Sequence, residues 1–394
     1  MSTMRRRAPM LGSSMRKDGN LLAPSGLSAE RAGPTTFGGN ESWPYLRVAA
    51  LRLSVVFLAA AAVPLGAQQR PWELRDFAMP GGNFYVRVPA FVDAARAAFL
   101  TDDDRVVGIA GDGTAKAYPA DVVVWHHGIE DRIGEVPVFV TWCNECNTAM
   151  VYRAQMDGRD LMFFHTNMVS QNMTFADRET RTRWQQQTGE AIEGPLKGRR
   201  LPIYPFVLTS WKEWRDTHPG TLVMEPLAGF EGLYAVWRDV IRWRRPGRAV
   251  GASAERVQRE DTRLPAYEPV VGVSAGGAQR SYPRAILEKE LVVNDSLGGE
   301  EVLLLYVRAS DMVTVFSRKL GGRILNFERR SPSGDLVDRE TASRWNAYGE
   351  CLDGPLRGSH LTALLGVPQF WWAWTTFYPA TDVYAGMGAA PKRR

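Results

Sequence analysis

The chain has 394 residues, of which 45% are hydrophobic and 23% are charged. This composition is typical of a globular protein with room for two domains. The net charge of +5 arises within residues 1–67, which hold eight Lys or Arg against three acidic residues, so the neutral remainder gives no reason to expect nucleic-acid binding.

The first 67 residues divide into two predicted segments. Residues 1–46 are rich in Gly, Ser, Pro and Arg without apolar periodicity, which indicates a disordered extension. Residues 47–67 combine Arg47 and Arg52 with an apolar run at 53–63 and a small-residue end, the pattern of a signal peptide. The alternative is an uncleaved N-terminal anchor, through which we would expect any contact with a membrane. We expect export to the periplasm or the cell exterior, where cysteines meet oxidising conditions.

Beyond residue 67 the sequence contains two related copies. Matching segments recur in the same order at an offset of 164 residues, and later of about 160. The clearest pairs are Tyr118-Pro119 with Tyr282-Pro283, residues 177–180 with 338–341, residues 194–196 with 354–356, and Trp211 and Trp214 with Trp371 and Trp374. A period of this length is a whole domain rather than a solenoid unit. We therefore predict a first domain at 68–230, a basic linker at 231–262, a degenerate second copy at 263–386 and a tail at 387–394.

Short β-rich runs punctuated by Gly and Pro dominate both copies, and helical periodicity is sparse. In chain order, the pattern predicts helices at 88–99, 118–125 and 211–217, and strands at 136–142, 148–152, 161–166, 302–307 and 312–316. The expected fold class is α+β and β-rich, with two tandem related domains that are each built around a mostly antiparallel sheet.

Cys143 and Cys146 form a Cys-x-x-Cys motif between two of the predicted strands. The spacing predicts a tight hairpin, and Asn147 tolerates the left-handed backbone that such a turn often needs. Two thiolates and the turn amides would then face one point, as in a metal-binding knuckle. A thioredoxin-type motif should instead open an amphipathic helix, and no helical periodicity follows Cys146 for at least seven residues.

A comparison of the two copies separates shared scaffold from residues with a special role. Three side chains that could bind metal disappear together in the second copy while the Gly-Pro-Leu loops and tryptophans persist: Cys143 (Val307 in copy two), Cys146 (Ser310) and His126 (Glu290). Two thiolates and an imidazole suit zinc or copper and leave a fourth position open. We therefore predict Cys143, Cys146 and His126 as ligands of a copper or zinc ion, with His127 and His165 as weaker candidates.

Three functional hypotheses follow from these residues. The first is an exported protein that binds copper or zinc, for metal carriage or a small redox step. The second is a thiol–disulfide oxidoreductase that uses the same cysteines. The third is a non-enzymatic scaffold in which Cys143 and Cys146 form a structural disulfide. The sequence contains no nucleotide or flavin fingerprint, no phosphate loop and no Ser-His-Asp order, and it does not indicate a partner.

The series of motifs in the first copy resembles the prokaryotic domain family of unknown function DUF3179. The resemblance runs from about residue 76 to 221 and is carried by residues 117–119 (AYP), Trp125-His126, residues 131–134 (DRIG), Cys143 and Cys146, Asn172, residues 177–180 (DRET), Trp184, residues 188–191 (TGEA) and residues 194–196 (GPL). The family's usual knuckle has Pro after the first cysteine and Gly after the second, where this chain has Asn144 and Asn147. The resemblance implies the fold grouping and the site, and the family name carries no activity.

Overall fold

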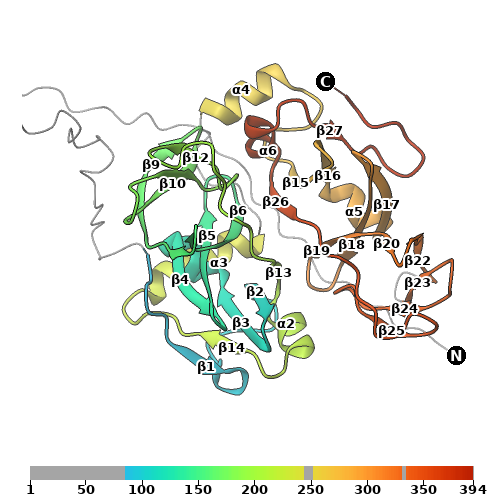
Figure 1. Ribbon diagram of the computed structural model, residues 1–394, viewed down its shortest axis with the longest axis horizontal. Helices are drawn as coiled ribbons and strands as arrows, with labels where there is room; N and C mark the ends of the chain where they lie inside the picture. Colours follow the sequence, from blue (N-terminus) through green and yellow to red (C-terminus); the bar gives the residue numbers. More distant parts are fainter. Residues whose placement is uncertain (1–84, 244–251, 331–333, 394) are drawn as a thin grey trace, which may run out of the picture. The chain divides into compact units, whose positions relative to one another are not determined.

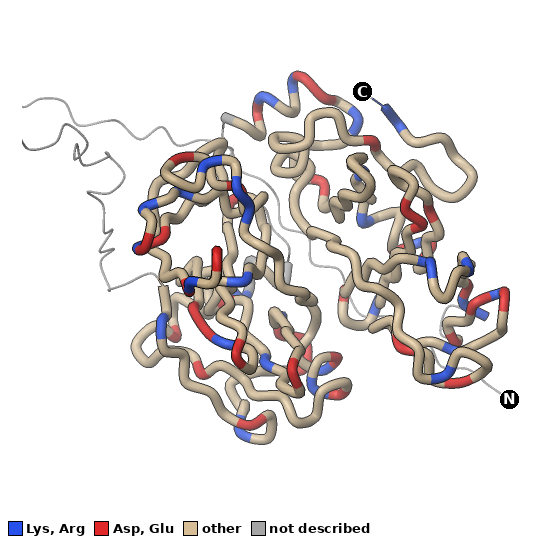
Figure 2. The backbone as a smooth tube through the Cα atoms, viewed as in Figure 1, with Lys and Arg blue, Asp and Glu red and all other residues tan. Residues whose placement is uncertain are grey.

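The computed structural model describes residues 85–243, 252–330 and 334–393 (Figure 1). The predicted extension (1–46) and signal peptide (47–67) lie outside these residues. Within the described ranges, no helix is both long enough and apolar enough to cross a membrane. Lys and Arg alternate with Asp and Glu along the described chain instead of gathering in one region (Figure 2). The fold is rich in strands and its sheets are mostly antiparallel, which confirms the predicted class.

The first half of the molecule, residues 85–230, begins with a five-stranded sheet. Its strand order is β1-β14-β3-β2-β13, and every pairing is antiparallel except that of β14 with β3. The elements are β1 (Phe91–Asp93), β2 (Arg105–Gly111), β3 (Thr114–Pro119), β13 (Val207–Ser210) and β14 (Leu222–Met224), with helices α1 (Ala120–His126) and α2 (Trp211–Thr217). Trp214 of α2 packs directly on β2, where a Cβ on Gly108 would lie 2.3 Å from the indole ring. The glycine is therefore required for close packing of the helix on the sheet.

Two further sheets in this half carry the Cys-x-x-Cys motif and its surroundings. The antiparallel sheet β4-β5-β6 contains the motif, a short ribbon β7-β8 follows, and a four-stranded antiparallel sheet has the order β12-β11-β10-β9. The strands are β4 (Gly128–Ile133), β5 (Val136–Cys143), β6 (Thr148–Arg153), β7 (Gln155–Met156), β8 (Arg159–Asp160), β9 (Phe163–Val169), β10 (Asn172–Asp177), β11 (Arg183–Gln185) and β12 (Ala191–Glu193).

The second half, residues 263–386, repeats this topology. The sheet β26-β15-β16-β27 corresponds to β13-β2-β3-β14, β17-β18-β19 to β4-β5-β6, β20-β21 to β7-β8, and β22-β23-β24-β25 to β9-β10-β11-β12. Its elements are β15 (Pro269–Ala275), β16 (Ala278–Pro283), α5 (Arg284–Glu290), β17 (Val292–Leu297), β18 (Glu300–Val307), β19 (Met312–Ser317), β20 (Lys319–Leu320), β21 (Arg323–Ile324), β22 (Phe327–Arg329), β23 (Leu336–Asp338), β24 (Arg344–Trp345), β25 (Cys351–Asp353), β26 (Gly366–Phe370), α6 (Trp371–Phe377) and β27 (Asp382–Val383).

The described residues of the two halves belong to one compact unit. Residues of both halves meet in a common apolar core, which contains Cys143 and Cys146 together with Trp371 and Trp374. Strand β26 contacts β6, and β13 contacts β19, so each half places the same strand against the other. We call this contact region the seam. The duplicated topology is therefore present, whereas the predicted division into two separate domains is not confirmed.

Two segments differ from the sequence prediction. Residues 88–99, predicted as a helix, form the edge strand β1 and a short 3₁₀ turn at Ala94–Arg96, because the segment pairs with β14 at the open edge of the sheet. The predicted linker at 231–262 contains two helices, α3 (Glu231–Trp243) and α4 (Ala252–Glu260). Helix α3 packs on α1, where Arg238 forms an ion pair of 2.7 Å with the buried carboxylate of Asp121. A buried carboxylate needs such a partner, so this part of the range belongs to the fold.

Candidate functional site

The Cys-x-x-Cys motif lies on the predicted β-hairpin. Cys143 ends β5 and pairs with Thr148, the first residue of β6. The turn is closed by a backbone hydrogen bond from the Asn147 amide to the Asn144 carbonyl at 3.3 Å. Asn147 has a φ of 53°, the left-handed conformation expected for it. The local sequence therefore predicts the turn correctly, with Asn in the place where the usual knuckle of the family that the sequence resembles has Gly.

The two sulfurs of the motif lie next to each other in the apolar core that both halves share. The Sγ atoms are 3.1 Å apart, and both thiols are free. Cys143 and Cys146 expose 1% and 0% of their surface. The second half contributes to this burial, since the Phe370 amide donates a hydrogen bond of 3.2 Å to the Cys146 carbonyl. The pair is thus a buried dithiol at the seam.

The pKa values of the two thiols are shifted in opposite directions. Burial by itself would raise the pKa of Cys143, but hydrogen bonds from the Cys146 thiol and from the backbone amides of Cys146 and Met173 favour its thiolate, and the resulting pKa is lower than usual. For Cys146, burial and its hydrogen bond with Cys143 both raise the pKa. Cys143 is therefore the sulfur that ionises, and Cys146 is the sulfur that keeps its proton.

A side-chain amide donates a hydrogen bond to the Cys146 sulfur. Asn172, at the start of β10, donates from Nδ2 to the Cys146 sulfur at 3.3 Å, and the Cys146 thiol lies 3.4 Å from the Gln171 carbonyl oxygen. The Asn172 amide is itself fixed: its Oδ1 accepts from Gln185 Nε2 at 2.6 Å and from the Gln187 backbone amide at 3.0 Å. The orientation of the donor toward sulfur is thus set by these two contacts.

Gln186 links this amide to the strands that carry the motif. Its Oε1 accepts from Asn172 Nδ2 at 2.8 Å, and its Nε2 donates to the Thr141 hydroxyl and to the Thr148 carbonyl, both at 3.0 Å. Thr141 in turn donates to the Met150 carbonyl at 3.0 Å. We call Asn172, Gln185, Gln186 and Thr141 the amide network. It is a continuous and uncharged set of hydrogen bonds that ends at the thiols.

The third predicted ligand, His126, lies on the other face of the hairpin sheet. Phe139 and Cys143 of β5 belong to the core that contains the thiols, whereas the alternating residues Val140 and Trp142 belong to a second core with helix α1. His126 ends α1 on that second side, where its Nε2 is 2.7 Å from the Tyr234 hydroxyl. The structure therefore does not bring the three predicted ligands together.

The loss of His126 in the second copy has a structural explanation. Glu290, at the equivalent end of α5, accepts a hydrogen bond of 2.9 Å from the Tyr384 hydroxyl. In both halves, the side chain at this position forms a hydrogen bond with a tyrosine that comes later in the sequence. The tyrosine is Tyr234 in the first case and Tyr384 in the second. His and Glu can each perform this task, so the exchange does not depend on the thiols.

The two weaker histidine candidates lie together on the thiol side of the sheet. The rings of His127 and His165 stack with centroids 5.8 Å apart, and His127 Nδ1 is 3.2 Å from the Trp142 carbonyl oxygen. Burial lowers the pKa of His127 to about 4 and that of His165 to about 3. Both rings are therefore neutral at pH 7. Over the residues that the structure describes, no group of three or more His, Cys, Asp or Glu is placed to hold a metal ion.

The amide network was not predicted, although the sequence contains a signal for it. At the equivalent positions of the second half, two of the four network residues become apolar, since Thr141 is replaced by Leu305 and Gln186 by Ala347, whereas Gln185 stays polar as Asn346. Thr148, whose carbonyl accepts from Gln186, is replaced by Met312. The comparison of copies that selected the cysteines would also have selected these residues if it had been applied to amides and hydroxyls. Asn172 entered the prediction only through the family resemblance.

Comparisons with known proteins identify a family for this chain. A family model described as "Protein of unknown function (DUF3179)" matches residues 85–381, so that the match extends across both halves and beyond the 76–221 range of the predicted resemblance. No curated protein and no solved structure matches the chain. Because the family model covers most of the chain, including the hairpin, the thiols and the amide network, the protein belongs to the DUF3179 family.

Proposed function

We propose that Cys143 and Cys146 form a redox-active dithiol, and that the protein is an exported thiol–disulfide oxidoreductase. The observation that carries this proposal is the pair of sulfurs 3.1 Å apart, with donors to Cys143 that favour a thiolate and a retained proton on Cys146. A disulfide bond is about 2.05 Å long, so a movement of roughly 1 Å would close it. Paired thiols of unequal acidity are what two-step exchange requires.

The reaction follows from this inequality. The Cys143 thiolate attacks one sulfur of a disulfide in the substrate, which breaks the substrate's S–S bond and releases its other sulfur as a thiolate that takes up a proton. Cys146 then loses its proton and attacks the Cys143 sulfur, which closes the Cys143–Cys146 bond and releases the second substrate thiol. With the proton that Cys143 releases when it ionises, the protein loses two electrons and two protons, and the substrate disulfide gains them. The reverse sequence oxidises a dithiol.

The amide network fits this role better than it fits a metal site. It provides neutral donors to Cys146 and no further thiolate, imidazole or carboxylate. The network also holds the turn rigidly, which keeps the sulfurs within reach of each other. The burial of both sulfurs favours a small disulfide as the substrate over a disulfide within a folded protein.

A redox titration with mass measurement tests the proposal. The reduced protein is equilibrated in glutathione buffers and with 2-hydroxyethyl disulfide, free thiols are alkylated, and the products are weighed. We expect a two-electron conversion of the Cys143–Cys146 pair, and a mixed disulfide on Cys143 in the Cys146→Ser variant, which lacks the resolving thiol. Cys351→Ser is the matched control, because Cys351 is a third buried free thiol outside the site.

The same samples separate this function from the metal hypothesis. If Cys146→Ser traps no mixed disulfide with either reagent and the wild-type pair stays reduced, the oxidoreductase proposal is wrong. Stoichiometric copper or zinc that is present in the wild type and lost in Cys143→Ser would then support metal binding. A His126→Gln variant with unchanged metal content would assign that binding to the two sulfurs without the histidine.

A further inference from the structure

A cavity lies in the seam, outside the surroundings of the thiols. It has a volume of about 440 Å³ and lies where β13 of the first half contacts β19 of the second. Its walls are mainly apolar, with Ile203, Phe206, Val315 and Leu364 among them, and none of its lining residues is Lys, Arg, Asp or Glu. This volume and lining are typical of a site for a small molecule, and such sites often occur between two packed units of a chain.

Two polar side chains face each other in this cavity, one from each half. His218 packs its ring on Trp214 with centroids 4.0 Å apart, and Tyr348 meets His218 edge-on at 5.8 Å. Burial lowers the pKa of His218, so the ring is neutral at pH 7. The Tyr348 hydroxyl is buried and forms no hydrogen bond of ordinary length and angle with the residues that the structure describes. Its polar neighbours are Thr209 and Thr217, whose contacts partly offset the rise in its pKa that burial causes.

In the second half, a larger side chain fills the equivalent position of the seam. After α6, Tyr378 occupies the place that His218 has after α2, and it packs on Trp374 with centroids 4.2 Å apart. Tyr378 also lies beside Arg200, which is paired with Glu190 at 2.8 Å. A larger ring and an ion pair therefore occupy one side of the seam. On the other side, a smaller ring borders an uncharged cavity.

We propose that this cavity binds a small, uncharged aromatic molecule that carries one hydroxyl or carbonyl group. The apolar walls bury the ring system, and the absence of charged lining residues disfavours an ionic ligand, whose desolvation nothing would offset. The polar group lies against Tyr348 and His218, where it gives the buried hydroxyl the hydrogen bond that the protein alone does not provide. This site is independent of the dithiol and of the redox proposal.

Calorimetry with 2-naphthol as the probe tests this site, and 2-naphthalenesulfonate serves as its charged counterpart. We expect saturable binding of the alcohol and none of the sulfonate. Tyr348→Phe removes only the hydroxyl and should weaken 2-naphthol binding about 2- to 10-fold, the range for one neutral hydrogen bond. Ala110→Trp places a large ring at the exposed rim of the cavity and should abolish binding.

The control for added bulk is Ser274→Trp, which changes the equivalent exposed position on β15 and should leave 2-naphthol binding intact. Circular dichroism and thermal unfolding establish that each variant folds. If Ala110→Trp does not fold, the test is the affinity of Tyr348→Phe for 2-naphthol compared with that of the wild type. The proposal is overturned if the wild type shows no saturable binding of 2-naphthol. It is also overturned if folded Ala110→Trp binds as the wild type does.

Discussion

At the end of β5 the first half holds two thiols, whereas the equivalent turn after β18 in the second half is held by ion pairs. There, Asp311 accepts a hydrogen bond of 2.9 Å from the Tyr306 hydroxyl and pairs with Arg284 at 2.5 Å. Arg105 reaches across the seam from the first half to the Ser310 and Asp311 carbonyls. The same backbone turn is therefore fixed by charge in one half and surrounded by neutral groups in the other.

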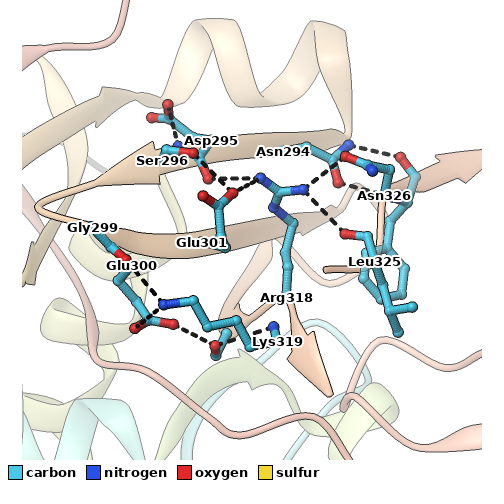
Figure 3. A network of polar contacts seen from close by, with 12 residues as sticks. Asn294, Asp295, Ser296, Gly299, Glu300, Glu301, Arg318, Lys319, Leu325 and Asn326 are labelled. Atoms are coloured by element: carbon cyan, nitrogen blue, oxygen red, sulfur yellow. Dashed lines mark hydrogen bonds and ion pairs between the residues drawn. The ribbon is translucent and has the colours of Figure 1, made fainter. Parts of the chain in front are cut away.

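A second polar network in the second half makes the same contrast (Figure 3). Arg318 follows β19 and binds Glu301, the Asp295 carbonyl at 3.2 Å and Asn326 Oδ1 at 2.7 Å. The equivalent residue in the first half is Ala154, which packs in the core that contains the thiols. The half without thiols thus uses buried charge to join its strands at this position.

The contrast shows which features the fold requires and which the site requires. Both halves share three tryptophans (Trp184 with Trp345, Trp211 with Trp371, Trp214 with Trp374), two helices and, apart from the edge strand β1, the strand order, so none of these depends on the thiols. Charges near a thiol shift its pKa strongly, and the first half places uncharged amides there instead. The carboxylate of Glu145 in the turn is the exception, and its charge opposes the ionisation of both cysteines. An uncharged surrounding is therefore the property that distinguishes the site from its duplicate.

The largest expected effect concerns the shared scaffold. Trp184 and Trp345 are equivalent, buried, and each donates from Nε1 to an aspartate at 2.9 Å. Replacing either by Ala should lower the free energy of unfolding by about 3–5 kcal/mol, because a large buried side chain is lost. Since both halves share one compact unit, both variants should shift one common denaturant transition, followed by fluorescence and circular dichroism.

Milder Trp→Phe variants at the same positions keep the measurement possible if the alanine variants do not fold. Two separate transitions, with each variant shifting only one of them, would show instead that the halves unfold as independent domains. That result would restore the two-domain prediction made from the sequence.

Features that depend on neighbouring residues were predictable from the sequence. The hairpin, its left-handed Asn147, the strands on either side and helix α2 all follow from local patterns, and α2 has the predicted bounds. The duplication was also visible, because ordered matches persist even where the chemistry has diverged. These predictions needed no knowledge of which elements pack together.

Features that depend on packing were not predictable. The alternation along β5 separates Cys143 from Trp142, but the sequence does not say which face α1 covers, and this decided the position of His126. The amide network joins β5 to residues more than 25 positions away, at Asn172 and beyond. The edge strand β1 became visible only through its pairing with β14, which lies over 120 residues later.

A smaller effect separates the halves by their response to acid. His127 and Leu291 occupy the same position after α1 and α5, with φ of 59° and 61°. Burial lowers the pKa of His127 to about 4, against 6.5 for an exposed histidine, so below pH 6.5 the unfolded chain binds this proton before the folded chain does. The stability that His127 contributes is thus complete above pH 6.5 and is lost as the pH falls toward 4.

His127→Leu, which copies the second half, should remove this acid dependence. Between pH 7.5 and pH 5, protonation of His127 alone should lower the free energy of unfolding of the wild type by about 2 kcal/mol. The decrease in the variant over the same pH range should be smaller by this amount. At pH 7.5 the variant loses the 3.2 Å contact with the Trp142 carbonyl, so a small constant decrease is expected. Urea unfolding at the two pH values measures both. Equal acid sensitivity of variant and wild type would contradict the prediction.

The smallest effect tests whether the amide network acts on the thiols. Thr141→Val removes the hydroxyl that accepts from Gln186 at 3.0 Å, and should cost about 1 kcal/mol of stability. Thr314→Val, the control, removes a buried hydroxyl that donates to the Ala347 carbonyl at 2.8 Å in the second half, at a similar cost. Because Gln186 positions Asn172 on the Cys146 sulfur, only Thr141→Val should also speed the alkylation of the two cysteines by iodoacetamide. Equal alkylation rates in the two variants would mean that the network supports the fold alone, and that the uncharged surroundings of the thiols do not govern their reactivity.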